Sequence, residues 1–213
     1  MTTMDKVVIK RWTPYPFRQF ILKIHGRCDL ACDYCYVFTK ADDRWRTRPP
    51  FMARSTMRAA ARRIAEHAST HRLPSVDVVL HGGEPLLAGP TELAYCLDVL
   101  RSVVGSATTV GIQLQTNGVR LDDALLRLFA RHRVRIGVSL DGERSAHDRH
   151  RVRANGTGSY DLVATALRRL GRPPYRDLFG GLLCTIDLAN DPVRTYEALL
   201  EFAPPTVDFL LPQ

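Results

Sequence analysis

The sequence predicts an α/β fold, a partial (β/α)6 TIM-like barrel of parallel strands that is open rather than closed. Short β-like runs alternate with helical patterns along the 213 residues, which is typical of right-handed βαβ units around a parallel sheet. The runs are apolar on one face and increasingly polar on the other toward their C-terminal ends. A doubly wound sheet buries both faces and gives nearly continuous apolar runs instead. The pattern therefore favours a barrel with helices outside and a ligand in the lumen.

The predicted elements alternate in order along the chain. The strands are residues 19–25, 76–81, 109–116, 134–141, 179–187 and 206–211. The helices are residues 56–70, 91–103, 122–132, 159–170 and 192–202. Three helix starts carry capping signals, namely Ser55, Asp122, and Asp191 followed by Pro192.

The composition and the net charge limit the classes of protein to which this chain can belong. Apolar residues make up 45% and no segment approaches the roughly 20 apolar residues that span a bilayer, which predicts a cytoplasmic protein without a membrane partner. The net charge of +8 comes from arginines spread over most helices, and without a nucleic-acid motif it predicts no nucleic-acid binding. We expect an N-terminal extension, 1–18, and a barrel core, 19–213, that is truncated after strand six because "TVDFLLPQ" is followed by no helix.

The stretch "CDLACDYCY", in the loop after the first predicted strand, contains three of the five cysteines, and these three span only eight residues. A structural zinc site normally takes four Cys or His ligands. Three thiolates on a four-iron cluster leave one iron open for a small molecule, so Cys28, Cys32 and Cys35 favour a catalytic iron–sulfur cluster, with zinc as the alternative. Cys96 and Cys184 stand alone in apolar patterns and are predicted core residues.

The stretch "HGGEP" ends the second predicted strand. Gly82 and Gly83 allow unusual backbone angles and a close approach of a ligand to the main chain. Glu84 then lies where it could meet an ammonium group. On the same rim as the three-cysteine loop, this turn is a predicted part of a binding site.

Taken in order, "CDLACDYCY", "HGGEP", "QTNG" and "SLDG" resemble the core of the radical SAM enzymes. More narrowly, "WTPYPFRQFILKIHGRCDLACDYCYVF" with "VDVVLHGGEPLLAG" resembles the FxsB-type, cyclophane-forming radical SAM/SPASM peptide maturases. The resemblance extends from about residue 12 to the end of the chain. The C-terminal SPASM domain of those maturases has no counterpart here, since no second cysteine cluster follows.

The resemblance implies a 4Fe–4S cluster held by Cys28, Cys32 and Cys35, whose open iron binds S-adenosyl-L-methionine (SAM). Reductive cleavage of SAM would give a 5′-deoxyadenosyl radical that abstracts a substrate hydrogen. The implied SAM contacts are Gly82, Gly83 and Glu84 to the ammonium, Tyr34 near the adenine, Asn117 and Ser139 near the ribose or methionyl part, and Arg151 to the carboxylate.

Some alternatives remain open within that assignment. Arg149 and Arg153 compete with Arg151 for the carboxylate, and His147 and Asp148 are either loop-ordering residues or ligands. Inward polar residues are candidates for a peptide-facing wall, namely Gln113, Gln115, Arg135, Asp141, Asp187 and Asp208.

The implied substrate is a ribosomally made precursor peptide that receives a side-chain crosslink, with a flavodoxin or ferredoxin as reductant. Three other functions remain as alternatives. One is a sulfatase-maturase-like peptide oxidase, one is a truncated remnant that binds cluster, cosubstrate or peptide without turnover, and one is a zinc-stabilised basic binding module.

Overall fold

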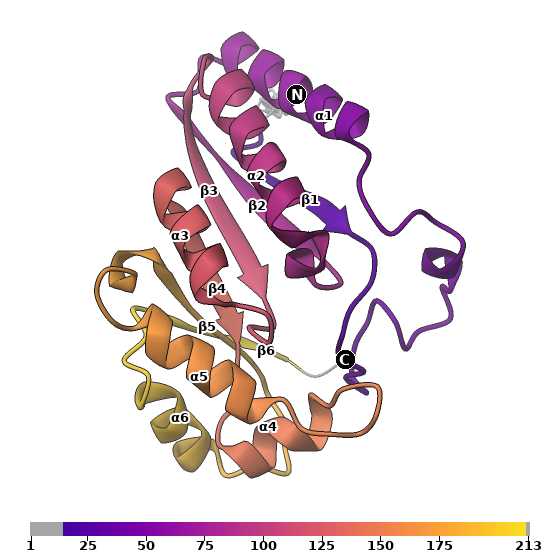
Figure 1. The fold of residues 1–213 in the computed structure, drawn as a ribbon, viewed down its shortest axis with the longest axis vertical. Coiled ribbons are helices and arrows are strands. Elements are labelled where there is room, and N and C mark those ends of the chain that lie inside the picture. Colours follow the sequence, from indigo (N-terminus) through magenta and orange to yellow (C-terminus); the bar gives the residue numbers. More distant parts are fainter. Residues whose placement is uncertain (1–14, 212–213) are drawn as a thin grey trace, which may run out of the picture.

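Six parallel strands form one open sheet with helices packed against one face (Figure 1). The structure is a computed structural model that describes residues 15–211. The strand order is β1-β2-β3-β4-β5-β6, so sequence neighbours pair and the first and last strands do not. The predicted partial, unclosed parallel barrel is therefore confirmed.

The strands lie close to their predicted positions. They are β1 Gln19–His25, β2 Ser75–Gly82, β3 Thr109–Thr116, β4 Val134–Ser139, β5 Phe179–Thr185 and β6 Val207–Leu210. β4 and β5 each end two residues before the predicted bound. The reason is that Asp141 turns its side chain to accept a hydrogen bond from the Thr185 amide, at 2.9 Å, where a longer ladder would have continued.

The long helices also match the prediction, with shifted ends. They are α1 Arg54–Thr70, α2 Gly89–Val99 with a π turn η3 at Leu100–Val104, α3 Asp123–His132, α5 Tyr160–Leu170 and α6 Pro192–Leu200. A further helix α4, Arg144–His150, and the 3-10 turns η1 Arg44–Arg46, η2 Pro85–Ala88 and η4 Arg176–Leu178 were not predicted. Within residues 15–211, no helix is both long and apolar enough to cross a membrane.

The capping predictions have mixed outcomes. Asp122 accepts a hydrogen bond from the Leu125 amide at 2.9 Å, and Asp191 accepts bonds from two amides of the first turn of α6. The prediction for Ser55 is wrong, because α1 begins at Arg54 and its N-cap, Ala53, makes no side-chain cap bond. The helix is instead stabilised by the apolar face that it buries.

The hydrophobic core lies between the strands and the helices. The outward side chains of the central strands are almost completely buried, for example Val78, Ile112 and Ile136, all at most 2% exposed. Cys96 and Cys184 belong to this core, at 7% and 1% exposed, as predicted. The opposite faces of β3 and β4 carry polar residues or glycine. At Gly137 an added Cβ would lie 2.3 Å from Gln115 Oε1, so the glycine makes room for the amide on the lumen face.

The described residues before β1 are 15–18, the end of the predicted extension. Residues 1–14 lie outside the described part of the chain. The Arg18 carbonyl accepts a hydrogen bond from the Asp77 amide at 2.8 Å, which joins the residue before β1 to β2.

We predict that Gly181→Ala destabilises the protein much more than Gly156→Ala. Both glycines have positive φ, of 131° and 79°, but only at Gly181 would a Cβ collide, 2.2 Å from Thr206 Oγ1 and 2.6 Å from Thr206 O. We expect the free energy of unfolding to fall by about 1 kcal/mol for Gly156→Ala and by about 3 kcal/mol or more for Gly181→Ala. Urea denaturation measures both, and equal losses would contradict the steric argument.

Candidate active site

The three-cysteine loop lies at the C-terminal edge of the sheet, directly after β1. Cys28, Cys32 and Cys35 are free thiols of intermediate exposure. The loop is anchored to the segment that follows α4. The Ala31 amide donates to the Val152 carbonyl at 2.7 Å, and Leu30 forms an antiparallel bridge with Arg153. Backbone hydrogen bonds therefore hold the loop without any disulfide.

One cavity of about 660 Å³ brings together most of the predicted site residues. Its lining includes eight of them: Tyr34, Cys32, Cys35, Gly82, Gly83, Asn117, Ser139 and Arg151. They come from the loops and strand ends after β1, β2, β3 and β4 and from the end of α4. Parallel strands put their carboxyl ends at one edge, which explains the convergence. The volume lies in the range of small-ligand sites.

Two predicted residues, Cys28 and Glu84, do not line this cavity. Cys28 borders it, because the Asn117 side-chain amide donates to Cys28 Sγ at 3.8 Å. The thiol groups are also partly desolvated. Burial raises the pKa of Cys28 to about 12 and that of Cys32 to about 11, and the Arg151 charge opposes the shift at Cys32. Metal ligation requires the thiolate, so assembly of a cluster here must displace these protons.

A 4Fe–4S cluster and a single zinc ion make different demands on the three cysteines. Among residues 15–211, no group of three His, Cys, Asp or Glu side chains surrounds a point as the ligands of a single metal ion do. A zinc ion needs its ligands at about 2.3 Å from one centre, whereas the thiolates of a 4Fe–4S cluster bind separate irons. The preference for a cluster over zinc therefore rests on the number of cysteines, since three thiolates leave one iron of a cluster open whereas a structural zinc ion normally takes four ligands.

Glu84 lies behind the cavity wall, 1% exposed. Its carboxylate accepts hydrogen bonds from the Leu86 amide at 2.9 Å, the Thr116 hydroxyl at 2.7 Å and the Asn117 amide at 2.7 Å. Burial raises the pKa of Glu84 to about 7, although these bonds oppose the shift. The side chain therefore ties the turn after β2 to the end of β3, and its predicted contact with an ammonium group stays a prediction.

Asp29 is a site residue that the sequence did not reveal. One carboxylate oxygen accepts from the Asn117 side-chain amide at 2.9 Å, and the other accepts from Arg120 Nε at 2.8 Å. Asp29 therefore joins the cysteine loop to the loop after β3. The only sequence signal for Asp29 is its position next to Cys28 in the cysteine loop. That position does not indicate that Asn117 and Arg120 are its hydrogen-bond partners.

Asp141 links more of the site than any other side chain described here. It is 2% exposed, and Oδ2 accepts hydrogen bonds from the Tyr34 hydroxyl and from Arg151 Nε, the latter at 2.7 Å. Oδ1 accepts from the Thr185 amide at 2.9 Å. The Arg151 guanidinium also lies over the Tyr34 ring, 5.6 Å from its centroid. The sequence suggested Asp141 only as a candidate for the lumen wall.

The structure separates the three candidate arginines. Arg149 pairs with Asp187 and donates to Asn190 Oδ1 at 2.9 Å, away from the cavity. Arg153 is exposed and does not line the cavity either. Arg151 alone of the three is buried, at 8% exposed, and lines the cavity.

His147 and Asp148 order the loop around Arg151. The Asp141 amide donates to His147 Nδ1 at 3.3 Å, and His147 Nε2 lies 2.9 Å from the Ser159 hydroxyl, which donates to the Arg151 carbonyl at 2.7 Å. Asp148 Oδ1 accepts from the Ser159 and Tyr160 amides, both at 2.8 Å. Both side chains thus have protein partners and neither lines the cavity.

Fold and site together define the core of a partial-barrel enzyme with a three-cysteine loop at its catalytic rim. Residues 22–185 match the family model described as the radical SAM superfamily. The chain therefore belongs to the radical SAM superfamily, whose members use a 4Fe–4S cluster and SAM.

Two curated relatives are anaerobic sulfatase-maturating enzymes. The serine-type anaerobic sulfatase-maturating enzyme of Klebsiella aerogenes is 33% identical over 158 residues, which are 71% of this chain and 36% of the relative. The cysteine-type enzyme of Clostridium novyi (strain NT) is 25% identical over 147 residues, 69% of this chain and 38% of the relative. The chain thus spans well under half the length of these curated relatives. The resemblance to FxsB-type maturases is not confirmed by them.

A solved structure shares the fold. Native anSMEcpe with bound AdoMet superposes with a TM-score of 0.79 at 21% identity, covering 92% of this chain and 52% of that chain. At this identity the match shows the fold alone. It agrees with the open six-stranded parallel sheet described above.

We predict that acid destabilises the protein through His147. Burial, with a further contribution from the Arg151 charge, lowers the pKa of His147 to about 4, against an ordinary 6.5. Since the folded-state pKa is the lower one, the unfolded chain binds the proton first, and stability falls as pH drops through the window between them. The contribution of His147 amounts to a loss of about 2 kcal/mol by pH 5.

The matched comparison is His147→Gln, which keeps a donor and an acceptor but does not titrate. Its melting temperature should fall less between pH 7 and pH 5 than that of the unaltered protein. An identical pH dependence in the two proteins would show that His147 is not the group that responds to acid.

Proposed function

We propose that this chain is the catalytic core of a radical SAM enzyme that modifies a peptide. The observation that supports it most is the meeting of the cysteine loop, the glycine turn after β2 and a buried arginine around one cavity. As further parts of the proposal, the protein acts in the cytoplasm and receives electrons from a flavodoxin or ferredoxin.

In this proposal Cys28, Cys32 and Cys35 hold the cluster. When bound and reduced, the cluster supplies the electron that cleaves SAM to methionine and a 5′-deoxyadenosyl radical, which takes a hydrogen atom from the peptide. The chain contributes the three thiolates, a loop held by backbone hydrogen bonds and a cavity wall that is partly apolar. Leu30, Phe38 and Leu183 supply apolar surface to that wall.

Arg151 is proposed to bind the SAM carboxylate. Its Nε is engaged by Asp141, and in the described residues no hydrogen bond involves its two terminal nitrogens. An arginine fork held by a buried carboxylate is well ordered for bidentate binding of a second carboxylate. This geometry favours Arg151 over Arg149, which is already paired with Asp187.

The remaining contacts surround that anchor. Tyr34, fixed by its bond to Asp141, is proposed to face the adenine. Gly82 and Gly83, with Glu84 behind them, are proposed to meet the ammonium group. Asn117 and Ser139 are proposed to approach the ribose or methionyl part, and the Ser139 hydroxyl is held by the Gln115 side-chain amide at 3.1 Å.

The reaction on the peptide has two candidates. The resemblance of the N-terminal stretch supports a crosslink between a β-carbon and an aromatic ring, which gives a cyclophane. The sulfatase-maturating relatives support a second candidate, oxidation of a single cysteine or serine. Mass spectrometry of the peptide product distinguishes them, because a crosslink joins two residues into one fragment and an oxidation changes one residue alone.

We predict that Cys32→Ala abolishes both the cluster and radical formation. After anaerobic reconstitution with iron and sulfide, then dithionite and SAM, the unaltered protein should yield 5′-deoxyadenosine by chromatography. Cys32→Ala should yield none and should lack the iron–sulfur absorption. Cys96→Ala, a change in a core cysteine 7% exposed, is the matched control and should keep its iron.

The contrary results have separate meanings. A Cys32→Ala protein that still bound four irons would contradict the ligand assignment. An intact cluster in the unaltered protein without 5′-deoxyadenosine would favour a non-catalytic remnant over an enzyme.

We also predict that Arg151→Lys weakens SAM binding while Arg149→Lys does not. Lysine keeps the charge but loses the fork and the Nε bond to Asp141, so the dissociation constant should rise by about 10-fold to 100-fold. Equilibrium dialysis with labelled SAM on the reconstituted proteins measures it. Similar losses for the two variants would contradict the choice of Arg151.

A further inference from the structure

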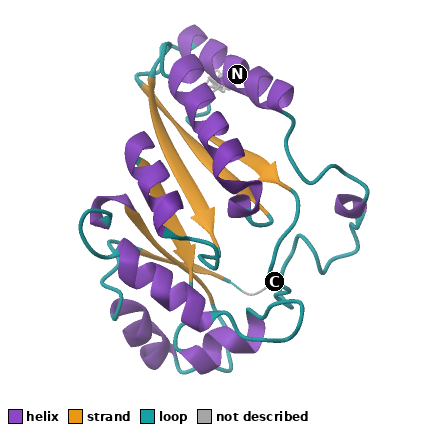
Figure 2. Ribbon diagram, in the orientation of Figure 1, coloured by secondary structure: helices purple, strands orange, loops and turns teal. Residues whose placement is uncertain are grey.

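A second cavity, also of about 660 Å³, lies beside the cavity that Cys32 and Cys35 line, which is called the cluster cavity from here on. The proposed chemistry does not use the second cavity. It is bounded by the end of β1, by the start of α1 and by the long loop between them, which Figure 2 shows extending away from the helices. Its lining includes Lys23, Arg27, Tyr36, Arg44, Trp45, Arg48, Phe51 and Asp42.

The loop that forms this cavity is held by hydrogen bonds from one arginine. The Arg27 guanidinium donates to the carbonyls of Trp45, Arg46 and Arg48, the last two at 3.1 and 3.0 Å. The returning end of the loop is tied to β1, since the Gly26 amide donates to the Pro50 carbonyl at 2.7 Å. The cavity is therefore built by the chain itself.

The charge of the lining is strongly one-sided. Four cationic side chains, Lys23, Arg27, Arg44 and Arg48, face a single carboxylate, Asp42, which Arg44 already pairs at 2.6 Å. In the described part of the chain, neither Lys23 nor Arg48 has a carboxylate oxygen within 4.0 Å. The cavity thus presents unneutralised positive charge to a ligand.

Aromatic side chains alternate with these charges. Trp45 has Arg46 over its ring at 4.5 Å and Phe38 edge-on at 4.9 Å, which fixes its orientation. Tyr36 and Phe51 are 56% and 48% exposed and offer apolar surface in the same cavity. Such a lining suits a peptide that carries both carboxylates and apolar side chains.

The two cavities share a wall. Tyr36, Val37 and Gly83 line both of them. A peptide with one residue in the cluster cavity therefore reaches the basic cavity within a short length of extended chain. Resting on the proposed function, we propose that the basic cavity binds an acidic segment of the substrate peptide, next to the residue that is modified.

The test is direct binding of two synthetic peptides to the reconstituted protein. One is a short fluorescein-labelled peptide of Glu and Phe residues, and the other has Gln in place of each Glu. Fluorescence anisotropy should show tighter binding of the Glu peptide, weakening as salt is added. Equal binding of the two peptides would overturn the inference.

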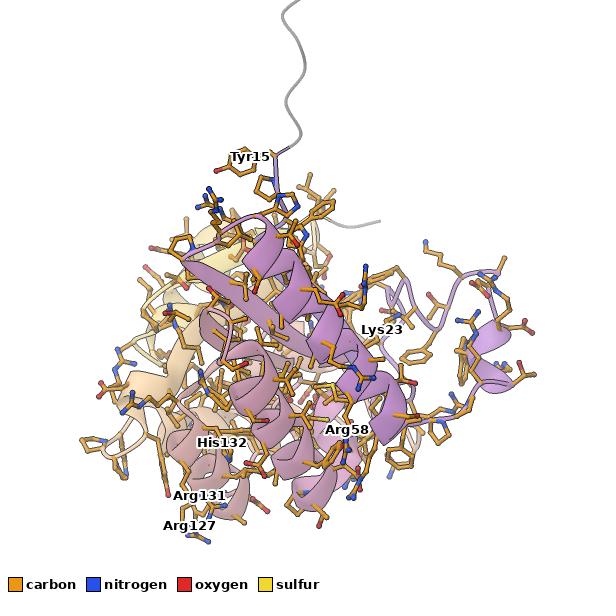
Figure 3. The ribbon with its side chains drawn as sticks, turned by 90° about the horizontal axis from the view of Figure 1, so that it is seen from above. Tyr15, Lys23, Arg58, Arg127, Arg131 and His132 are labelled. Carbon is orange, nitrogen blue, oxygen red and sulfur yellow. The ribbon has the colours of Figure 1, made fainter. Side chains whose placement is uncertain are left out.

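A double variant localises the effect. Lys23→Gln with Arg48→Gln should weaken binding of the Glu peptide by about fivefold to tenfold. The matched control is Arg127→Gln with Arg131→Gln, which removes the same charge from α3; Figure 3 shows these two arginines far from Lys23 and the loop. An equal loss in the control would show that net charge, and not this cavity, binds the peptide, and would overturn the inference.

A parallel assay separates this inference from the proposed function. Binding is measured without SAM or reductant, and 5′-deoxyadenosine is measured without peptide. Product without selective binding of the Glu peptide overturns the basic cavity alone. Selective binding without product supports the cavity as an acidic-peptide site and overturns the radical chemistry.

Discussion

The buried Asp141 carboxylate is the constraint on which the candidate site depends. A carboxylate 2% exposed is costly unless donors surround it. Its donors are Tyr34 from the cysteine loop, Arg151 from the end of α4 and the Thr185 amide from β5. Satisfying one charge therefore sets the position of three segments that are distant in sequence. Arg151, which is proposed to bind the SAM carboxylate, and the cysteine loop are placed by the same interaction.

Two other carboxylates also join separate segments at this edge of the sheet. Glu84 joins the turn after β2 to the end of β3, and Asp29 joins the cysteine loop to the loop after β3. In a closed barrel, pairing of the first and last strands would hold the rim, but β1 and β6 do not pair here. Hydrogen bonds made by these polar side chains therefore fix the positions of the loops, which strand pairing would help to fix in a closed barrel.

The periodicity of apolar residues predicts the strands and the long helices. It does not predict which side chains form hydrogen bonds or ion pairs with one another in the folded protein. Alternation gave the strands, and parallel strands bring Tyr34, Asn117 and Ser139 to one edge. The choice of Arg151 over its neighbours required the burial of Asp141, which local sequence does not encode. Helix α4 was missed because only Ala146 and His147 of its seven residues are buried, too few for a helical period.

The two adjoining cavities have separate roles in the proposals made above, and their linings differ in charge. The cluster cavity has one arginine in its lining, Arg151, beside polar groups such as Gln115 and Asn117 and apolar groups such as Leu30 and Phe209. The proposed radical has to be kept from water, which requires that the bound substrate and cosubstrate fill this cavity. Lys23 and Arg48, by contrast, are exposed and keep their hydration until an anion arrives. Four cationic side chains line the basic cavity, whereas one arginine lines the cluster cavity. In the proposal, the acidic segment of the peptide is therefore attracted to the basic cavity without adding charge at the reaction site.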